Sequence, residues 1–278
     1  MRSSNPVFSR RGFTRGDGGY AGFGGQQQAQ PGPQAGTNPY NTQSTPEQLY
    51  DLYQAPPAGP LQTGRMTIDD VVMRTGMTLG TVAVGAVVGW VALAGSLGLA
   101  IGAALVAFVL AMVQAFKREP VPALILGYAA FEGIFLGVIS EAYNQQWSGA
   151  PLQAVLATMA VSGGMLVAYR TRLIRVTSRY QRIGLAIAIG FVGLLLVNLV
   201  LALFGVDLGL RSGPLGIIVG IVGVLLGAFF LSLDFKQIED GITYGAPQRE
   251  AWLAAFGLTL SLVWIYLEML RLISILRD

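Results

Sequence analysis

Apolar runs of about twenty residues, the length that crosses a bilayer as a helix, recur along the chain from Gly76 onward. At a rise of 1.5 Å per residue, each run matches the ~30 Å hydrocarbon core. The pattern predicts an all-α membrane protein with seven transmembrane helices. The predicted spans are Gly76–Ala94, Leu97–Phe116, Val121–Glu141, Leu152–Tyr169, Ile183–Gly205, Leu215–Leu233 and Trp252–Leu276.

The first two predicted spans are separated only by Gly95 and Ser96. One continuous helix across both would have about forty apolar residues, which is too long for a bilayer. We therefore predict a helical hairpin that turns at these two residues.

The beginning of the chain has a different composition, rich in Gly, Gln, Pro, Ser and Asn, with no apolar core of a signal peptide. Such a segment cannot bury enough apolar surface to offset its conformational entropy. We predict a disordered cytoplasmic tail over residues 1–66 and a transmembrane domain over 67–278. A patch at Thr45 to Tyr53 could form a short helix, either as a docking motif or, as we favour, as part of a linker.

Charge is scarce, and its placement predicts an orientation. Charged residues make up 12% of the chain and hydrophobic residues 53%, whereas soluble domains carry about 25% charged residues. If the tail is cytoplasmic, 15 of the 18 Lys and Arg residues lie inside, and only Arg211, Arg271 and Arg277 do not. The positive-inside rule then predicts a cytoplasmic N-terminus and an external C-terminus. We expect a multi-pass protein of the plasma membrane.

Cysteine and histidine are both absent. Their absence excludes disulfides, thiolate nucleophiles, Ser–His catalysis and Cys/His zinc sites. The Gly-x-Gly-Asp motif of aspartyl intramembrane proteases is also missing. We expect no enzyme activity, no tightly bound cofactor and no nucleic-acid partner; the lipid bilayer is the expected environment.

Glycine pairs at a spacing of four recur within the spans, as in helices that approach one another closely in membranes. They are Gly133-x-x-x-Gly137, Gly216-x-x-x-Gly220 and Gly223-x-x-x-Gly227. The spacing predicts a compact helical bundle and is explained by packing alone.

A few polar residues within the spans are candidate functional groups, because ionisable side chains in a bilayer are costly unless paired or hydrated. Asp234 closes the sixth span, Glu268 lies in the seventh, Glu132 in the third and Asn198 in the fifth. Structural interpretations exist: a solvated helix end for Asp234, a protonated carboxyl that holds a neighbouring helix for Glu132, and neutralisation of Glu268 by Arg271 on the same helix face. We favour Asp234 and Glu268 as the functional pair, with Glu132 next.

Two of these acids lie in motifs that resemble those of the Bax inhibitor (TMBIM-type) family. LDFKQI (Leu233 to Ile238) and YLEML (Tyr266 to Leu270) resemble the paired acidic motifs of its last two helices. FEGIFLG in the third span and YRTRLIRVTSRYQR between the fourth and fifth spans are similar to its prokaryotic branch. The resemblance covers residues 67–278.

The resemblance implies six helices around a central, hydrophobic seventh. It also implies a pH-sensitive calcium leak channel gated by two acids that share protons, with Ca²⁺ as the permeant ion. Asp234 matches the first acid and Glu268 the second, where the family usually has aspartate. A basic residue at the end of the second span would pair with the first acid as a latch, and Lys117 and Arg118 both fit.

Two departures from the family pattern bear on the acid pair. The second acid is glutamate, and the spacing between the acids is about ten residues longer than usual in the family, so contact would need residues 250–257 to project beyond the bilayer. If the acids do meet, two carboxylates in a low-dielectric site cannot both ionise cheaply and would titrate as a unit.

Two other functions are compatible with a multi-pass protein of this kind. One is a non-conducting regulator that binds another membrane protein, such as a membrane-anchored AAA protease, as some prokaryotic relatives are thought to do. The other is a proton-coupled transporter, which the lack of an inverted repeat and of interrupted helices disfavours.

Overall fold

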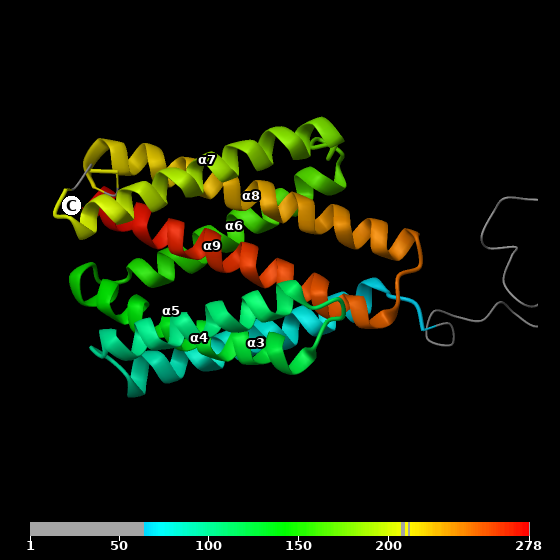
Figure 1. Ribbon diagram of the computed structural model, residues 1–278, viewed down its shortest axis with the longest axis horizontal. Helices are drawn as coiled ribbons and strands as arrows, with labels where there is room; N and C mark the ends of the chain where they lie inside the picture. Colours follow the sequence, from blue (N-terminus) through cyan, green and yellow to red (C-terminus); the bar gives the residue numbers. More distant parts are fainter. Residues whose placement is uncertain (1–63, 207–208, 211, 278) are drawn as a thin grey trace, which may run out of the picture. The chain divides into compact units, whose positions relative to one another are not determined.

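The computed structural model describes residues 64–206, 209–210 and 212–277. In these residues it contains seven helices long and apolar enough to cross a membrane, and no β-strand (Figure 1). They are α3 (Ile68–Ala92), α4 (Leu97–Phe116), α5 (Pro122–Gln146), α6 (Ala150–Arg170), α7 (Ser178–Leu203), α8 (Gly213–Thr243) and α9 (Ala251–Arg277), with a 3₁₀ turn, η1 (Gln248–Glu250), before α9. The prediction of seven spans is confirmed. The proposed tail, apart from its last residues, and the short helix at 45–53 lie outside the described residues.

The hairpin between α3 and α4 forms where the sequence predicts it. Gly95 adopts a left-handed conformation with φ +75°, which glycine accepts at little cost. The amide of Ser96 donates to the carbonyl of Leu93 at 3.0 Å and closes the turn.

Several helices extend beyond their apolar runs, most of all α3 at its start and α8 at its end. The polar first turn of α3 is held by a capping box, in which the Asp70 amide donates to Thr67 Oγ1 at 3.2 Å and the Thr67 amide to Asp70 Oδ2 at 3.1 Å. In α8, Lys236 pairs with Asp240 at 2.7 Å one turn later. Gly76 and Leu233 are therefore wrong as helix ends, because the apolar run stops while the helix continues for further polar turns.

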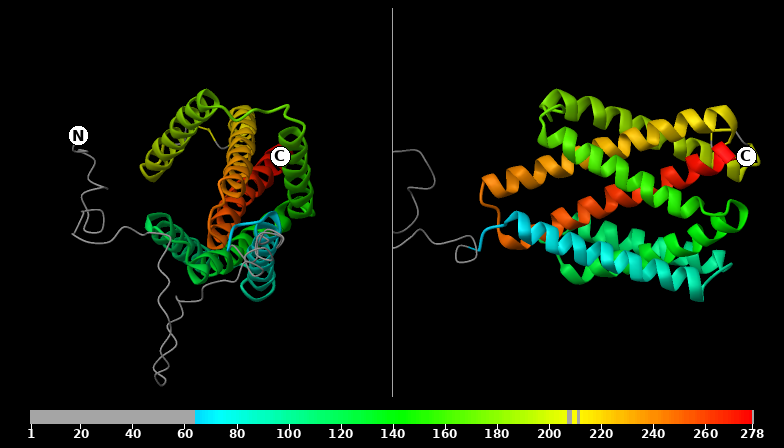
Figure 2. Two further views of the ribbon diagram at one scale, coloured as in Figure 1. Left: turned by 90° about the vertical axis from the view of Figure 1, so that its right-hand side faces the viewer. Right: turned by 180° about the vertical axis from the view of Figure 1, so that it is seen from behind.

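Helix α9 lies at the centre of the bundle, as the family resemblance implies. It packs directly against α3, α5, α6 and α8. It reaches α4 through a cluster that joins Phe256 to Ala107, and α7 through Trp264, whose ring centroid lies 6.2 Å from that of Phe191. Figure 2 shows α7, in yellow-green, at the edge of the bundle, where its main neighbour is α8.

The glycines of α3 and α5 allow these two helices to pack backbone against backbone. A Cβ atom on Gly133 would lie 3.0 Å from the Cα of Gly85, and one on Gly137 would lie 2.9 Å from the Cα of Ala86. The glycine spacing in α5 therefore marks a tight helix interface, as predicted.

The two ends of the bundle differ in charge. The end that carries the start of α3 and the loops 117–121, 171–177 and 244–250 is termed the basic end here (Figure 1). Its loops and the adjoining helix turns carry Arg65, Arg74, Lys117, Arg118, Arg170, Arg172, Arg175, Arg179, Arg182, Lys236 and Arg249. Large apolar side chains are exposed on the outer faces of the helices between the two ends, as contact with lipid requires.

Candidate functional site

The interface between α8 and α9 contains both acids that the sequence singles out. The two helices are consecutive and antiparallel, and their register is visible in the glycines of α8. Gly220 lies opposite Leu272, and Gly227 lies opposite Ile265. This register places Asp234 and Glu268 at different heights in the bundle.

The carboxyl group of Asp234 is half-buried against α9. Ser261 Oγ donates to Asp234 Oδ2 at 2.5 Å. Gly257, one turn earlier in α9, leaves room for the carboxyl, since a Cβ atom there would lie 2.9 Å from Asp234 Oδ1. Asp234 makes no ion pair and has no second hydrogen-bond donor within the described ranges.

The acid-binding seat, defined as Asp234, Gly257 and Ser261, lies well inside the helical part of the bundle. Asp234 is nine residues before the end of α8 at Thr243, which corresponds to about 14 Å along the helix axis. Asp234 is therefore not a solvated helix terminus. The sequence offers a weak signal for Ser261, a small polar residue within an apolar span, but that signal does not identify its partner.

Glu268 has a different environment, deeper in the bundle. Glu268 is 8% exposed and Arg271 is 5% exposed. Arg271 Nη2 donates a hydrogen bond to Glu268 Oε2 at 2.6 Å. Gly223 of α8 lies opposite the carboxyl group. The indole of Trp264 donates to the carbonyl of Gly223 at 2.9 Å and fixes this part of the interface. Glu268 therefore forms an ion pair with Arg271 three residues later, which is the structural alternative given for it from the sequence.

The structure does not bring Asp234 and Glu268 together. Gly223, which lies opposite Glu268, is eleven residues before Asp234 in α8, an axial separation of about 16 Å. In two antiparallel helices joined by a loop, residues that are equally far from the loop lie at the same height along the bundle. Asp234 lies ten residues before that loop, at 244–250, and Glu268 eighteen residues after it. Contact between the two acids, which the sequence left open, does not occur in the structure, and the condition for a shared proton is not met.

The predicted latch does not form either. Lys117 and Arg118 are exposed at the end of α4, and neither makes an ion pair in the part of the chain that the structure describes. The corner between α4 and α5 is joined instead to the start of α9, where Arg249 Nη1 lies 2.9 Å from Glu119 Oε2.

The two remaining candidates lie in α5 and α7. Glu132 is half-buried and makes no hydrogen bond or ion pair among residues 64–206, 209–210 and 212–277. Asn198 is 6% exposed, and its Oδ1 has no hydrogen-bond partner in the same residues. The structural alternative for Glu132, a protonated carboxyl that holds a neighbouring helix, therefore has no hydrogen bond to support it in the described residues.

A hydrogen-bonded clasp at the basic end was not anticipated from the sequence. Backbone hydrogen bonds of 2.8 Å join the segment 64–66 to the loop 246–248. Gln248 Nε2 donates to Asp70 Oδ1 at 2.6 Å, and Arg74 donates to the carbonyl of Gln248. The clasp links the start of α3 to the loop between α8 and α9, close to the end of the helices that hold the acid-binding seat.

Comparison with known proteins places these features in a family. The model of the family described as Bax inhibitor 1 like matches residues 5–278. The comparison with curated proteins finds no match. Since the family match covers nearly the whole chain, including all seven helices and both acidic motifs, the chain belongs to the Bax inhibitor 1 like family of membrane regulators and channels.

Proposed function

We propose that the protein is a pH-sensitive cation leak channel, with Ca²⁺ as the permeant ion, in which Asp234 alone senses protons. The observation that supports this is the acid-binding seat, where one serine hydroxyl is the single donor found for Asp234 in the described chain. An ionised carboxylate has about four acceptor positions. A closed α8–α9 interface therefore accommodates the neutral carboxyl better than the ion.

The proposed opening step follows from hydration of this carboxyl. Ionised Asp234 needs more hydrogen-bond donors than Ser261 supplies, and its half-buried position against α9 limits contact with water. Loss of the proton would therefore favour separation of α8 from α9 near the seat. Carboxylate, serine and backbone oxygens, together with water, are the ligands that a hard cation such as Ca²⁺ prefers. The leak should then increase as pH rises.

Glu268 has no sensing role in this proposal. Its charge is compensated by Arg271 at 2.6 Å, and its distance from Asp234 along the helix axis does not allow a shared proton. The pair instead stabilises the half of the bundle away from the basic end.

Calcium flux into liposomes that contain only the purified protein tests the proposal, from about pH 6 to about pH 8. Asp234→Asn should abolish the rise of flux with pH. Asp240→Asn is the matched control, because Asp240 lies on the same helix, pairs with Lys236 and is more exposed; it should keep the wild-type profile. Equal flattening by Glu268→Gln, with no further effect in the double variant, would show that the acids are coupled and would refute a single sensor.

The alternative is a non-conducting regulator that binds another membrane protein, such as a membrane-anchored AAA protease. Protein that is folded in liposomes but passes no Ca²⁺ at any pH would refute the leak and favour this function.

A further inference from the structure

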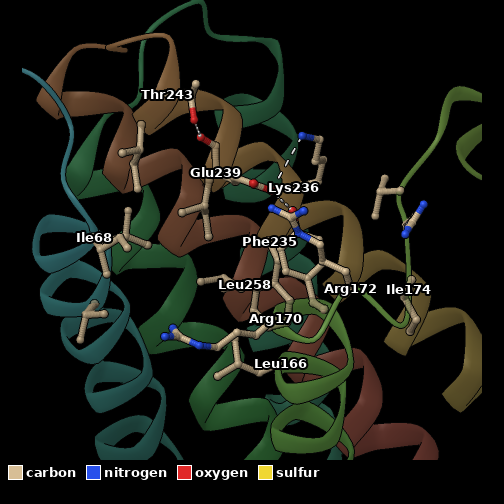
Figure 3. A pocket seen from close by; sticks show the side chains of 17 residues that line it. Ile68, Leu166, Arg170, Arg172, Ile174, Phe235, Lys236, Glu239, Thr243 and Leu258 are labelled. Atoms are coloured by element: carbon tan, nitrogen blue, oxygen red, sulfur yellow. Dashed lines mark hydrogen bonds and ion pairs between the residues drawn. The ribbon is translucent and has the colours of Figure 1, made fainter.

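A pocket at the basic end borders the acid-binding seat without including it: Phe235 and Leu258 line the pocket, and the three residues of the seat do not. It has a volume of about 770 Å³ and lies between α3, α6, the loop 171–177 and α8 (Figure 3). Its wall is apolar and accessible: Ile68 is 64% exposed, Val72 65% and Leu166 51%. An accessible apolar wall at the end of a membrane bundle is suited to an amphipathic ligand rather than to a polar solute.

The rim of this pocket carries an excess of positive charge. Arg170, Arg172 and Arg175 line it and are exposed. None of the three makes an ion pair within the described part of the chain. Guanidinium groups match the oxygens of a phosphate in a bidentate geometry, which makes phosphate the favoured anion here.

The acid at the pocket, Glu239, does not neutralise these arginines. It accepts a hydrogen bond from the Tyr169 hydroxyl and lies 3.8 Å from Lys236, which also pairs with Asp240 at 2.7 Å. Figure 3 shows Glu239 and Lys236 together on α8, with Arg170 extending separately toward α3. The arginine charges thus remain available to a ligand.

The backbone of Arg172 gives an independent indication of function. Its φ is +59°, and every other described residue with a positive φ is glycine. The Arg172 amide donates to the Tyr169 carbonyl at 3.0 Å just after α6 ends, a position that glycine or asparagine normally occupies. Arginine is strained there relative to glycine. A residue in a strained conformation at the rim of a pocket is a candidate functional position.

We propose that this pocket binds an anionic phospholipid. The phosphate would lie on Arg170, Arg172 and Arg175, and an acyl chain would run along the apolar wall at Ile68 and Leu166. The pocket lies where α6 ends and beside the polar turns of α8 that follow its apolar run, which is the level of the lipid headgroups. The proposal goes beyond the calcium leak and does not depend on it.

Native mass spectrometry of the full-length protein in detergent, titrated with phosphatidylglycerol or phosphatidylcholine, tests this site. We expect phosphatidylglycerol to bind more tightly, and each Arg→Gln change at 170, 172 or 175 to weaken that binding about fivefold. Arg179→Gln with Arg182→Gln is the matched control, because both arginines are exposed at the same end but do not line the pocket. The control should change binding less than about twofold.

Arg172→Gly separates a role in binding from a role in folding. Relief of the backbone strain should raise the melting temperature in detergent, while loss of the guanidinium should lower phosphatidylglycerol affinity about fivefold. Unchanged affinity in this variant, equal losses in the control pair, or equal affinity for phosphatidylcholine would overturn the proposal. Displacement of the lipid by inorganic phosphate at similar concentration would show a free-anion site and would overturn it as well.

Discussion

A single hydroxyl group of α9 decides how the Asp234 carboxyl is held. Ser261 Oγ donates to Asp234 at 2.5 Å, and a donor of this kind favours the ionised form of its acceptor. We therefore expect Ser261→Ala to disfavour ionisation and to move the pH midpoint of calcium flux upward.

Ser261→Thr is the control for this change, because it retains the hydroxyl and should keep the midpoint close to that of the wild type. A midpoint that moves downward in Ser261→Ala, or does not move, would place the proton sensor elsewhere, with Glu132 as the next candidate.

The Glu268–Arg271 pair makes a prediction about stability. Both groups are buried, and removal of one partner leaves an uncompensated charge in a low-dielectric site. Arg271→Met should lower the free energy of unfolding by about 3 kcal/mol. The double variant Glu268→Gln/Arg271→Met should recover part of that loss, because the uncompensated carboxylate is then absent. Unfolding in mixed detergent measures both, and strictly additive losses would argue against a direct interaction.

At the scale of whole elements, the contact between α3 and α5 depends on glycine. A Cβ atom on Gly137 would lie 2.8 Å from the carbonyl carbon of Ala86, which belongs to the backbone and cannot move aside. Gly137→Ala should therefore destabilise the protein by about 1–3 kcal/mol. Thermal unfolding in detergent measures the change.

Gly102→Ala in α4 provides the matched control, since no atom lies within 4 Å of a Cβ placed there. This change should be neutral or stabilising by up to about 1 kcal/mol, because alanine favours helix over glycine. Similar effects of the two substitutions would mean that α3 and α5 are less closely packed than the structure shows.

For the whole molecule, the number of spans predicts where the two ends of the bundle lie. Seven crossings place the loop 171–177 and the C-terminus on opposite sides of the membrane. Arginine is concentrated at the basic end, which the positive-inside rule assigns to the cytoplasm. A reporter inserted in the loop 171–177 should therefore read cytoplasmic, and one fused after the last residue should read external. Two reporters on the same side would contradict seven crossings, and the hairpin at Gly95 and Ser96 would be the first element to re-examine.

The sequence by itself determined the seven helices, the hairpin turn and the candidate acids. The length of an apolar run is a property of consecutive residues, so each span can be recognised without knowledge of its neighbours. The same property explains the wrong boundaries of α3 and α8, because hydrophobicity does not report polar helical turns that continue past the apolar run. The acidic motifs and the family were also recognisable at this level, since both are patterns in consecutive residues.

Only the tertiary structure decided which partner each acid has. The register of α8 against α9 depends on the position of the loop between them and on the α9 side chains that pack against the glycines of α8. Both are properties of the two helices together. That register brings Asp234 to Ser261 and leaves Glu268 to Arg271. The pocket at the basic end likewise combines residues of α3, α6, the loop 171–177, α8 and α9. Contacts between helices depend on rotation and axial offset, which no single helical segment encodes.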